Sequence, residues 1–294
     1  MKKDNSTTVK KAEQQRVLAI HDLSGHSHTS LMAIIPILNY YGIGVTALPT
    51  AILSSNTEQN GFQLVEMTSH LNGFLQQWKQ LKLSFDAIYS GFLCSPEQVE
   101  IVLEAMQKFK KNKTLILVDP VMADDGKLYA CFRKSIIASM KKLITHADII
   151  TPNLTEAAFL LGEKYQNQVP AWLAKQWCKR LSDLGPRQVI ITNVPVFENP
   201  DRTSVICYDK DTDSFYRAFC NYLPVIYPGS GDIFACVLLA LLLKGVELSR
   251  AINKTVCFVS RAMQLTMEQN SPAREGIRLE QALKLLPRVL KTLS

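Results

Sequence analysis

Short apolar segments alternate with longer amphipathic segments along almost the whole chain. Stretches 30–42, 96–111 and 169–185 have the spacing of helices, and the first and last of them end on glycine. The short apolar runs between the helical stretches are bounded by polar residues, glycine or proline, which is typical of buried parallel strands. These runs are residues 16–21, 44–49, 85–90, 114–119, 147–151 and 188–192. The repeated strand-helix order predicts an α/β fold around a parallel sheet.

One segment late in the chain interrupts this order. Residues 203–220, TSVICYDKDTDSFYRAFC, show two alternating patterns around a polar turn, which predicts an antiparallel hairpin. Only helical patterns follow, at 231–244, about 248–267 and 279–292. No proline-rich linker or repeat divides the chain. We therefore expect a disordered tail, residues 1–15, and then one domain, residues 16–294, built as a three-layer α/β/α sandwich with a mainly parallel sheet.

Composition favours a water-soluble globular protein. The chain has 294 residues, of which 47% are hydrophobic, and this is enough for one substantial core. Its longest apolar run, 233–243, is far shorter than the roughly 20 residues of a membrane span. The basic N-terminal stretch is followed only by VLAI, which is too short for a signal-peptide core. We expect no membrane partner.

Cysteine and charge add two further expectations. The seven cysteines include no closely spaced pair, which indicates reduced thiols in a cytoplasmic protein. The net charge of +7 could suggest nucleic acid as a partner. However, the densest lysines, at 108–113 and 141–142, fall at predicted helix ends, where cations meet the helix dipole favourably. We expect small-molecule partners and no nucleic acid.

The stretch 227–245, YPGSGDIFACVLLALLLKG, places Asp232 between a Gly-Ser-Gly turn and an apolar helix. Such a turn points backbone N–H groups outward, and the helix N-terminus adds partial positive charge. Gly229, Ser230 and Gly231 are therefore a candidate anion hole. Taken alone, Asp232 is most simply a helix cap. The functional alternative is a general base that accepts a hydroxyl proton while the amides stabilise a phosphate.

Further polar side chains follow the ends of predicted strands, where ligands gather on parallel sheets. Asp119 ends one strand just before Pro120, and Asn153 and Glu156 follow another. Each of them could cap a turn or begin a helix. Together they supply the oxygen ligands that suit a hydrated Mg²⁺ and nucleotide phosphates. This combination favours the general-base interpretation of Asp232.

The ordered set of motifs resembles that of the vitamin B6 kinases, a branch of the ribokinase-like superfamily. The resemblance covers roughly residues 16 to 268. It rests on AIHDLSGH, DAIYSGFLCSPEQ, LVDPVMADDGKLY, ADIITPNLTEAAFLLG, VIITN and GSGDIFACVLLALLLKG. It implies a cytoplasmic, homodimeric pyridoxal kinase that uses ATP and Mg²⁺ to phosphorylate the 5'-hydroxymethyl group of pyridoxal, pyridoxine or pyridoxamine.

The resemblance also implies roles for individual residues. Asp232 would be the catalytic base, beside the anion hole formed by Gly229, Ser230 and Gly231. A second group would position the nucleotide and Mg²⁺, and it consists of Asp119, Asn153, Glu156 and Thr192, with Asp119 and Glu156 binding the metal directly or through water. A third group would line the vitamer pocket, and it consists of Asp22, Ser24, Asn56 and Thr57.

The sequence departs from the family pattern on the substrate side. Residues 24–28 read SGHSH where such kinases commonly have SGFGR. Residues 54–61 read SSNTEQNG, with Asn56 in place of the expected histidine, and Ala123 replaces a glycine that is usual after DPVM. The phosphate motifs are intact, so these departures leave the vitamer preference open.

Three alternatives to a B6 kinase remain. The nearest is a hydroxymethylpyrimidine kinase of the same superfamily, which tends to carry a cysteine where this chain has Asp232. A sugar or nucleoside kinase ranks lower, because the first hundred residues contain no clear extra β-sheet lid. A non-catalytic protein that binds a vitamer or nucleotide without turnover is the last.

Three histidines lie close together near the first predicted strand. His21, His26 and His28 have no acidic or cysteine partner at the spacing of a zinc site, which needs at least three good ligands. We expect ordinary surface or turn histidines here, ahead of a substrate contact by one of them.

Overall fold

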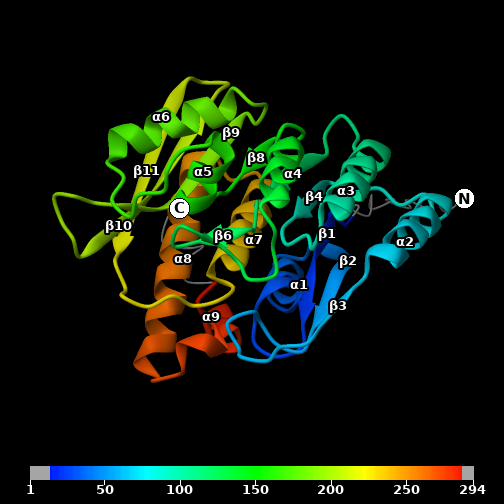
Figure 1. Ribbon diagram of the computed structural model, residues 1–294, viewed down its shortest axis with the longest axis horizontal. Coiled ribbons are helices and arrows are strands. Elements are labelled where there is room, and N and C mark those ends of the chain that lie inside the picture. Colours follow the sequence, from blue (N-terminus) through cyan, green and yellow to red (C-terminus); the bar gives the residue numbers. More distant parts are fainter. Residues whose placement is uncertain (1–13, 287–294) are drawn as a thin grey trace, which may run out of the picture.

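A mixed nine-stranded sheet runs through the centre of the computed structural model, which describes residues 14–286 (Figure 1). The strand order across the sheet is β11-β10-β9-β8-β5-β4-β1-β2-β3. The strands are β1 (Arg16–Ser24), β2 (Gly44–Leu53), β3 (Leu64–Glu66), β4 (Ala87–Ser90), β5 (Leu115–Val118), β8 (Ile149–Ile150), β9 (Gln188–Pro195), β10 (Arg202–Asp209) and β11 (Ser214–Asn221). A separate two-stranded ribbon joins β6 (Ala123–Asp124) to β7 (Lys127–Leu128).

The middle of the sheet is parallel and its two margins are antiparallel. Strands β2, β1, β4, β5, β8 and β9 pair in parallel, in that order. At one margin β10 pairs antiparallel with both β9 and β11, and at the other β3 pairs antiparallel with the end of β2. The predicted hairpin at 203–220 is therefore confirmed as β10 and β11.

Helices cover both faces of the sheet, which confirms the three-layer α/β/α fold. One face carries α2 (Thr68–Gln80), α3 (Pro96–Phe109), α4 (Ser135–Ile144), α5 (Leu154–Leu161) and α6 (Ala171–Ser182). The other face carries α1 (Ser30–Tyr40), α7 (Ser230–Leu243), α8 (Leu248–Glu268) and α9 (Leu279–Ala282). Alternation along β1 divides its side chains between the two cores, with Leu18 and Ile20 in the first and Val17 and Ala19 in the second.

Helix α7 explains the apolar run of the sequence. It contacts α1 and α8, and its residues from Ile233 to Leu241 are buried in the second core. Each fully buried aliphatic side chain of this kind contributes about 1.5–3 kcal/mol relative to an exposed one. The helix is therefore a rigid anchor, and its N-terminus has a fixed position at the edge of the sheet.

Several elements differ from the sequence-based expectations. The helical pattern at 279–292 begins as α9, continues as a short 3-10 turn, Leu283–Leu285, and then leaves the described residues. Helix α2 escaped prediction because only Leu71 and Leu75 of it are buried, which is too little for a clear periodicity. The expected tail, residues 1–15, lies outside the described residues except for its last two, and the single domain at 16–294 stays a prediction.

The described residues also bear on cysteine chemistry and on membranes. All seven cysteines are free thiols; Cys178, Cys207 and Cys236 are buried, whereas Cys131 and Cys257 are exposed. Between residues 14 and 286, no helix combines the length and the apolar character that crossing a bilayer requires.

Candidate functional site

The carboxyl ends of the parallel strands bring together side chains that are far apart in the sequence. Asp22 lies near the end of β1, Gly91 follows β4 and Asp119 follows β5. Asn153 follows β8 and forms a parallel bridge with Thr192 of β9. The N-terminus of α7 meets this edge, since a Cβ atom added to Gly231 would lie 3.8 Å from Asp119 Oδ2. The predicted phosphate-side residues therefore share one region of the fold.

The N-terminus of α7 has the geometry of an anion hole. Gly229 is the N-cap and has a φ of 84°, and a Cβ atom there would lie 2.7 Å from the His28 carbonyl oxygen. Only glycine combines this left-handed backbone with so close an approach. Within the described part of the chain, the amides of Gly231 and Asp232 have no hydrogen-bond acceptor, as expected for the first turn of a helix. Two N–H groups and the positive end of the helix dipole are thus available to an anion in the region of Asp119.

Asp232 is a buried carboxylate with defined partners. It is 8% exposed, and its Oδ2 accepts a hydrogen bond of 2.6 Å from the Ser30 amide at the start of α1. Its Oδ1 lies 3.1 Å from His21 Nε2. Burial raises the Asp232 pKa, but the nearby positive charge of His21 and the hydrogen bond from the Ser30 amide outweigh burial and lower it. Asp232 therefore stays ionised, and each oxygen keeps a lone pair for a ligand.

His21 corrects the expectation of a surface or turn histidine. It is 1% exposed, and its Nδ1 lies 2.9 Å from Asp22 Oδ1 while its Nε2 faces Asp232. The Nε2–H bond does not align with Asp232 Oδ1 well enough for a regular hydrogen bond, so this contact is mainly electrostatic. Of the other two histidines, His26 is exposed, and the half-buried His28 lies 3.5 Å from Glu280.

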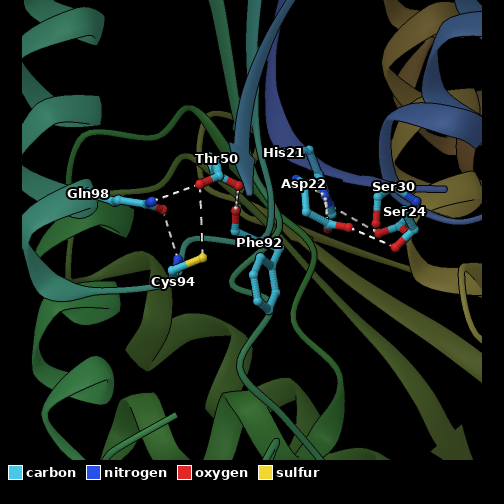
Figure 2. A network of polar contacts seen from close by, with 9 residues as sticks. His21, Asp22, Ser24, Ser30, Thr50, Phe92, Cys94 and Gln98 are labelled. Carbon is cyan, nitrogen blue, oxygen red and sulfur yellow. Dashed lines mark hydrogen bonds and ion pairs between the residues drawn. The ribbon is translucent and has the colours of Figure 1, made fainter. Parts of the chain in front are cut away.

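The ring of His21 rests directly on Gly91. A Cβ atom at Gly91 would lie 2.1 Å from both Cδ2 and Nε2 of His21. The segment after Gly91 is fixed from behind, because Thr50 Oγ1 donates to the Phe92 carbonyl at 2.8 Å and the Cys94 amide donates to Gln98 Oε1 at 2.8 Å (Figure 2). Glycine at this position thus makes room for the imidazole ring.

Asp119 is buried close to Asp232. The Asp119 pKa is raised to about 7, chiefly by burial and also by the Asp232 charge, while Thr151 and His21 act against this rise. Its Oδ1 accepts a hydrogen bond of 3.0 Å from Thr151 Oγ1. Its Oδ2 has no hydrogen-bond partner among the residues that the structure describes. This oxygen is therefore available to a cation or a ligand.

Asn153 and Glu156 form a capping box at the start of α5. Asn153 Oδ1 accepts from the Glu156 amide at 2.9 Å, and Glu156 Oε2 accepts from the Asn153 amide at 2.9 Å. The second oxygen, Glu156 Oε1, accepts from the Met122 amide at 3.1 Å. Burial raises the pKa of Glu156, as does the charge of Asp119. Glu156 thus holds the β5–β6 connection against α5, and a role in metal binding stays a prediction.

The predicted vitamer-side residues are occupied by contacts within the protein. Asp22 Oδ2 accepts a hydrogen bond of 3.0 Å from Ser24 Oγ, so Asp22 and Ser24 brace His21 (Figure 2). Asn56 Nδ2 donates at 2.9 Å to both Ser27 Oγ and the Arg274 carbonyl. The two departures from the family pattern, SGHSH and SSNTEQNG, are therefore physically coupled. Thr57 is half-buried beside them.

His21 is the site residue that the sequence analysis did not assign. Its signal was the alternation of β1, because odd-numbered positions from Val17 face the α7 side of the sheet. Continuing that alternation places His21 toward the N-terminus of α7, where Asp232 begins the helix. Gly91 gave no signal of its own, since its requirement comes from a contact between separate strands.

Comparison with known proteins agrees with this geometry. A family model described as phosphomethylpyrimidine kinase matches residues 37–275. A phosphomethylpyrimidine kinase structure from Bacteroides thetaiotaomicron, solved with pyridoxal, is 40% identical and has a TM-score of 0.91, covering 94% of this chain and 96% of that one.

Two further relatives are named as pyridoxal kinases. The structure of the Lactobacillus plantarum enzyme has a TM-score of 0.85 at 28% identity, covering 96% of this chain and 99% of that one. The pyridoxal kinase of Histophilus somni is 31% identical over 243 residues, which are 76% of this chain and 80% of the relative. The similarity therefore extends over nearly the whole fold and includes the strand ends and α7.

Proposed function

Because the chain belongs to the phosphomethylpyrimidine kinase family and is a vitamin B6 kinase of the ribokinase-like superfamily, we propose that it transfers the γ-phosphoryl group of ATP to the 5'-hydroxyl of a B6 vitamer. The observation that carries the residue assignments is the ionised Asp232 at the N-terminus of α7, beside two amides that have no acceptor among residues 14–286. A base and an anion hole at adjacent positions are what transfer of a phosphoryl group to an alcohol requires.

Asp232 has two tasks in the proposed reaction. Its free lone pairs accept the hydrogen of the 5'-hydroxyl and aim the oxygen at the γ-phosphorus. As the new O–P bond forms and the bond from the γ-phosphorus to the β,γ-bridging oxygen breaks, the hydroxyl proton passes to Asp232 and ADP leaves. The amides of Gly231 and Asp232, with the Gly229–Ser230 turn, hold the transferring phosphoryl oxygens.

Asp119 fits a Mg²⁺ ion that arrives with the nucleotide. Its Oδ2 has no protein partner in the described range, and burial makes its negative charge costly unless a cation is close. From residue 14 to residue 286, no three His, Cys, Asp or Glu side chains cluster as a metal site, so phosphate oxygens and water would complete the shell. When bound, Mg²⁺ would neutralise phosphate charge. Asn153 and Glu156 would support this side, with Thr192 near the nucleotide.

The vitamer would approach from the side of the 24–30 and 54–61 loops. We propose that Asp22, Ser24, Asn56 and Thr57 form this side of the vitamer pocket and shape it mainly by fixing its loops. A homodimer in the cytoplasm remains part of the proposal, and light scattering of the purified protein tests the dimer.

The test is ADP release with Mg-ATP and a panel of pyridoxal, pyridoxine, pyridoxamine, hydroxymethylpyrimidine and ribose. We expect turnover on at least one vitamer and a loss on the order of 10²-fold or more in Asp232→Asn. Preferred turnover of hydroxymethylpyrimidine would instead support the second kinase branch. ATP binding without turnover on any compound would support a non-catalytic protein.

A further inference from the structure

A buried histidine joins two buried carboxylates at the centre of the site. Asp22 Oδ1 lies 2.9 Å from Nδ1 of His21, and Asp232 Oδ1 lies 3.1 Å from Nε2. The ring has no room to rotate away, because Gly91 supports one side of it and Tyr89 meets it edge to face at a centroid distance of 6.0 Å. The Asp22 amide nitrogen also lies 3.0 Å from Nδ1. A ring protonated at both nitrogens would donate to Asp22 Oδ1 and attract Asp232, whereas a neutral ring could accept from the Asp22 amide at Nδ1.

The surroundings of His21 decide its charge. Burial by itself lowers the His21 pKa, but Asp232 and Asp22 outweigh burial and raise it to about 10. Asp119 is a further nearby carboxyl group, and Tyr89 stays neutral because burial raises its pKa. Among the described groups that act on the charges of Asp232 and Asp119, His21 is the one that can carry positive charge, so the imidazolium is the local positive charge that lets Asp232 remain ionised.

We propose that His21 is the positioning residue of the catalytic base: the imidazolium, braced by Asp22, holds the Asp232 carboxylate in one orientation and keeps it ionised. The Ser30 amide fixes the other carboxylate oxygen at 2.6 Å, so the plane of the carboxylate is set from two sides. This inference rests on the proposed function and adds to it the group that prepares the base.

The contacts of Asp232 favour a fixed orientation of its carboxylate more than a strong tendency to accept a proton. Protonating Asp232 would remove its attraction to His21, so early proton transfer is unfavourable. In phosphoryl transfer through a loose transition state, the hydroxyl proton can leave late, and alignment of the attacking oxygen matters more. A base that remains ionised at mildly acidic pH and does not rotate suits that chemistry.

The experiment uses the full-length protein and the variants His21→Gln and Asp232→Asn. The matched control is His70→Gln, because His70 lies exposed on α2, outside the site. Nitrogen-15 NMR of labelled histidine reports the protonation of the five imidazoles, and the signal that His21→Gln removes identifies His21. We expect His21 to carry both protons from pH 5 to pH 9 in the wild type, and to titrate within this range in Asp232→Asn.

Kinetics supply the second readout. In His21→Gln we expect kcat to fall about tenfold or more, and the acidic limb of the kcat/KM profile to move up by about one pH unit or more, since Asp232 loses its cation. The KM for ATP and the His70→Gln profile should match the wild type. A His21 that titrates near pH 6.5 in the wild type, or an unchanged acidic limb in a folded His21→Gln, overturns the inference. A protonated His21 in a wild type that phosphorylates no vitamer overturns the proposed function alone.

Discussion

Adding one methyl group at Gly91 should displace the His21 ring and so weaken the positioning of Asp232, although Gly91 does not contact Asp232 directly. Gly91 has no left-handed backbone, so alanine meets no conformational penalty there and the effect of Gly91→Ala is steric. Its Cβ would lie 2.1 Å from the His21 ring, whereas ordinary contacts begin at 3.4 Å. The Gly91 amide donates to the Ile20 carbonyl at 3.0 Å, and Thr50 and Gln98 hold the next residues. The ring must therefore yield rather than the backbone.

The size of the effect follows from this displacement. A retreat of the ring by more than about 1 Å breaks its hydrogen bond with Asp22 and lengthens its contact with Asp232. Loss of a hydrogen bond to a charged group costs about 1.5–3 kcal/mol, and overpacking adds about 1–3 kcal/mol. We expect the melting temperature to fall by about 5–15 °C. Misplacement of the base by about 1 Å should lower kcat/KM on the order of 10²-fold.

The assay compares thermal unfolding and vitamer phosphorylation for Gly91→Ala and for Gly73→Ala. Gly73 lies exposed within α2, and its added Cβ would have no neighbour within 4 Å, so alanine there should be neutral or stabilise by up to about 1 kcal/mol. Stability and kcat/KM of Gly91→Ala equal to those of Gly73→Ala would refute the argument that His21 requires this glycine.

Three further predictions concern the buried acids and His21. Asp119→Asn should lower activity but raise the unfolding free energy at pH 8 by about 1 kcal/mol or more. Because the Asp119 pKa is raised to about 7, the charge of the wild-type carboxylate destabilises the fold above that pH. The gain in unfolding free energy should therefore appear in denaturant titrations as the pH rises from 4 to 7, and it should be absent below pH 4. Glu156→Gln loses one of the two hydrogen bonds that Glu156 accepts from backbone amides, which should cost about 1–2 kcal/mol and lower the melting temperature. If Glu156 also binds water on the metal, the variant should need more Mg²⁺ for activity. Stability equal to that of the wild type would contradict the capping box. His21 is protonated more readily folded than unfolded, so the stability excess of wild type over His21→Gln should be full below pH 6.5 and narrow toward pH 10, and an excess that grows with pH would contradict its cationic state.

Local patterns in the sequence were sufficient to predict the three layers of the fold. Strand and helix periodicities depend on which residues are buried, and burial in a three-layer fold follows a simple repeat. The Gly-Ser-Gly-Asp turn could also be recognised, because its chemistry is contained in four consecutive residues. Helix α2 and the ribbon of β6 and β7 were missed, since the first is mostly exposed and the second is very short.

The sequence by itself determined the α/β order, the antiparallel margin at β10 and β11, and the placement of polar residues at strand ends. Only the tertiary structure decided what those residues touch. His21 lies beside Asp232, its ring packs against Gly91, and Asn56 donates a hydrogen bond to the Arg274 carbonyl. Each of these contacts joins segments that are distant in the chain. The charge of a buried group likewise depends on all its neighbours in space, which no local pattern records.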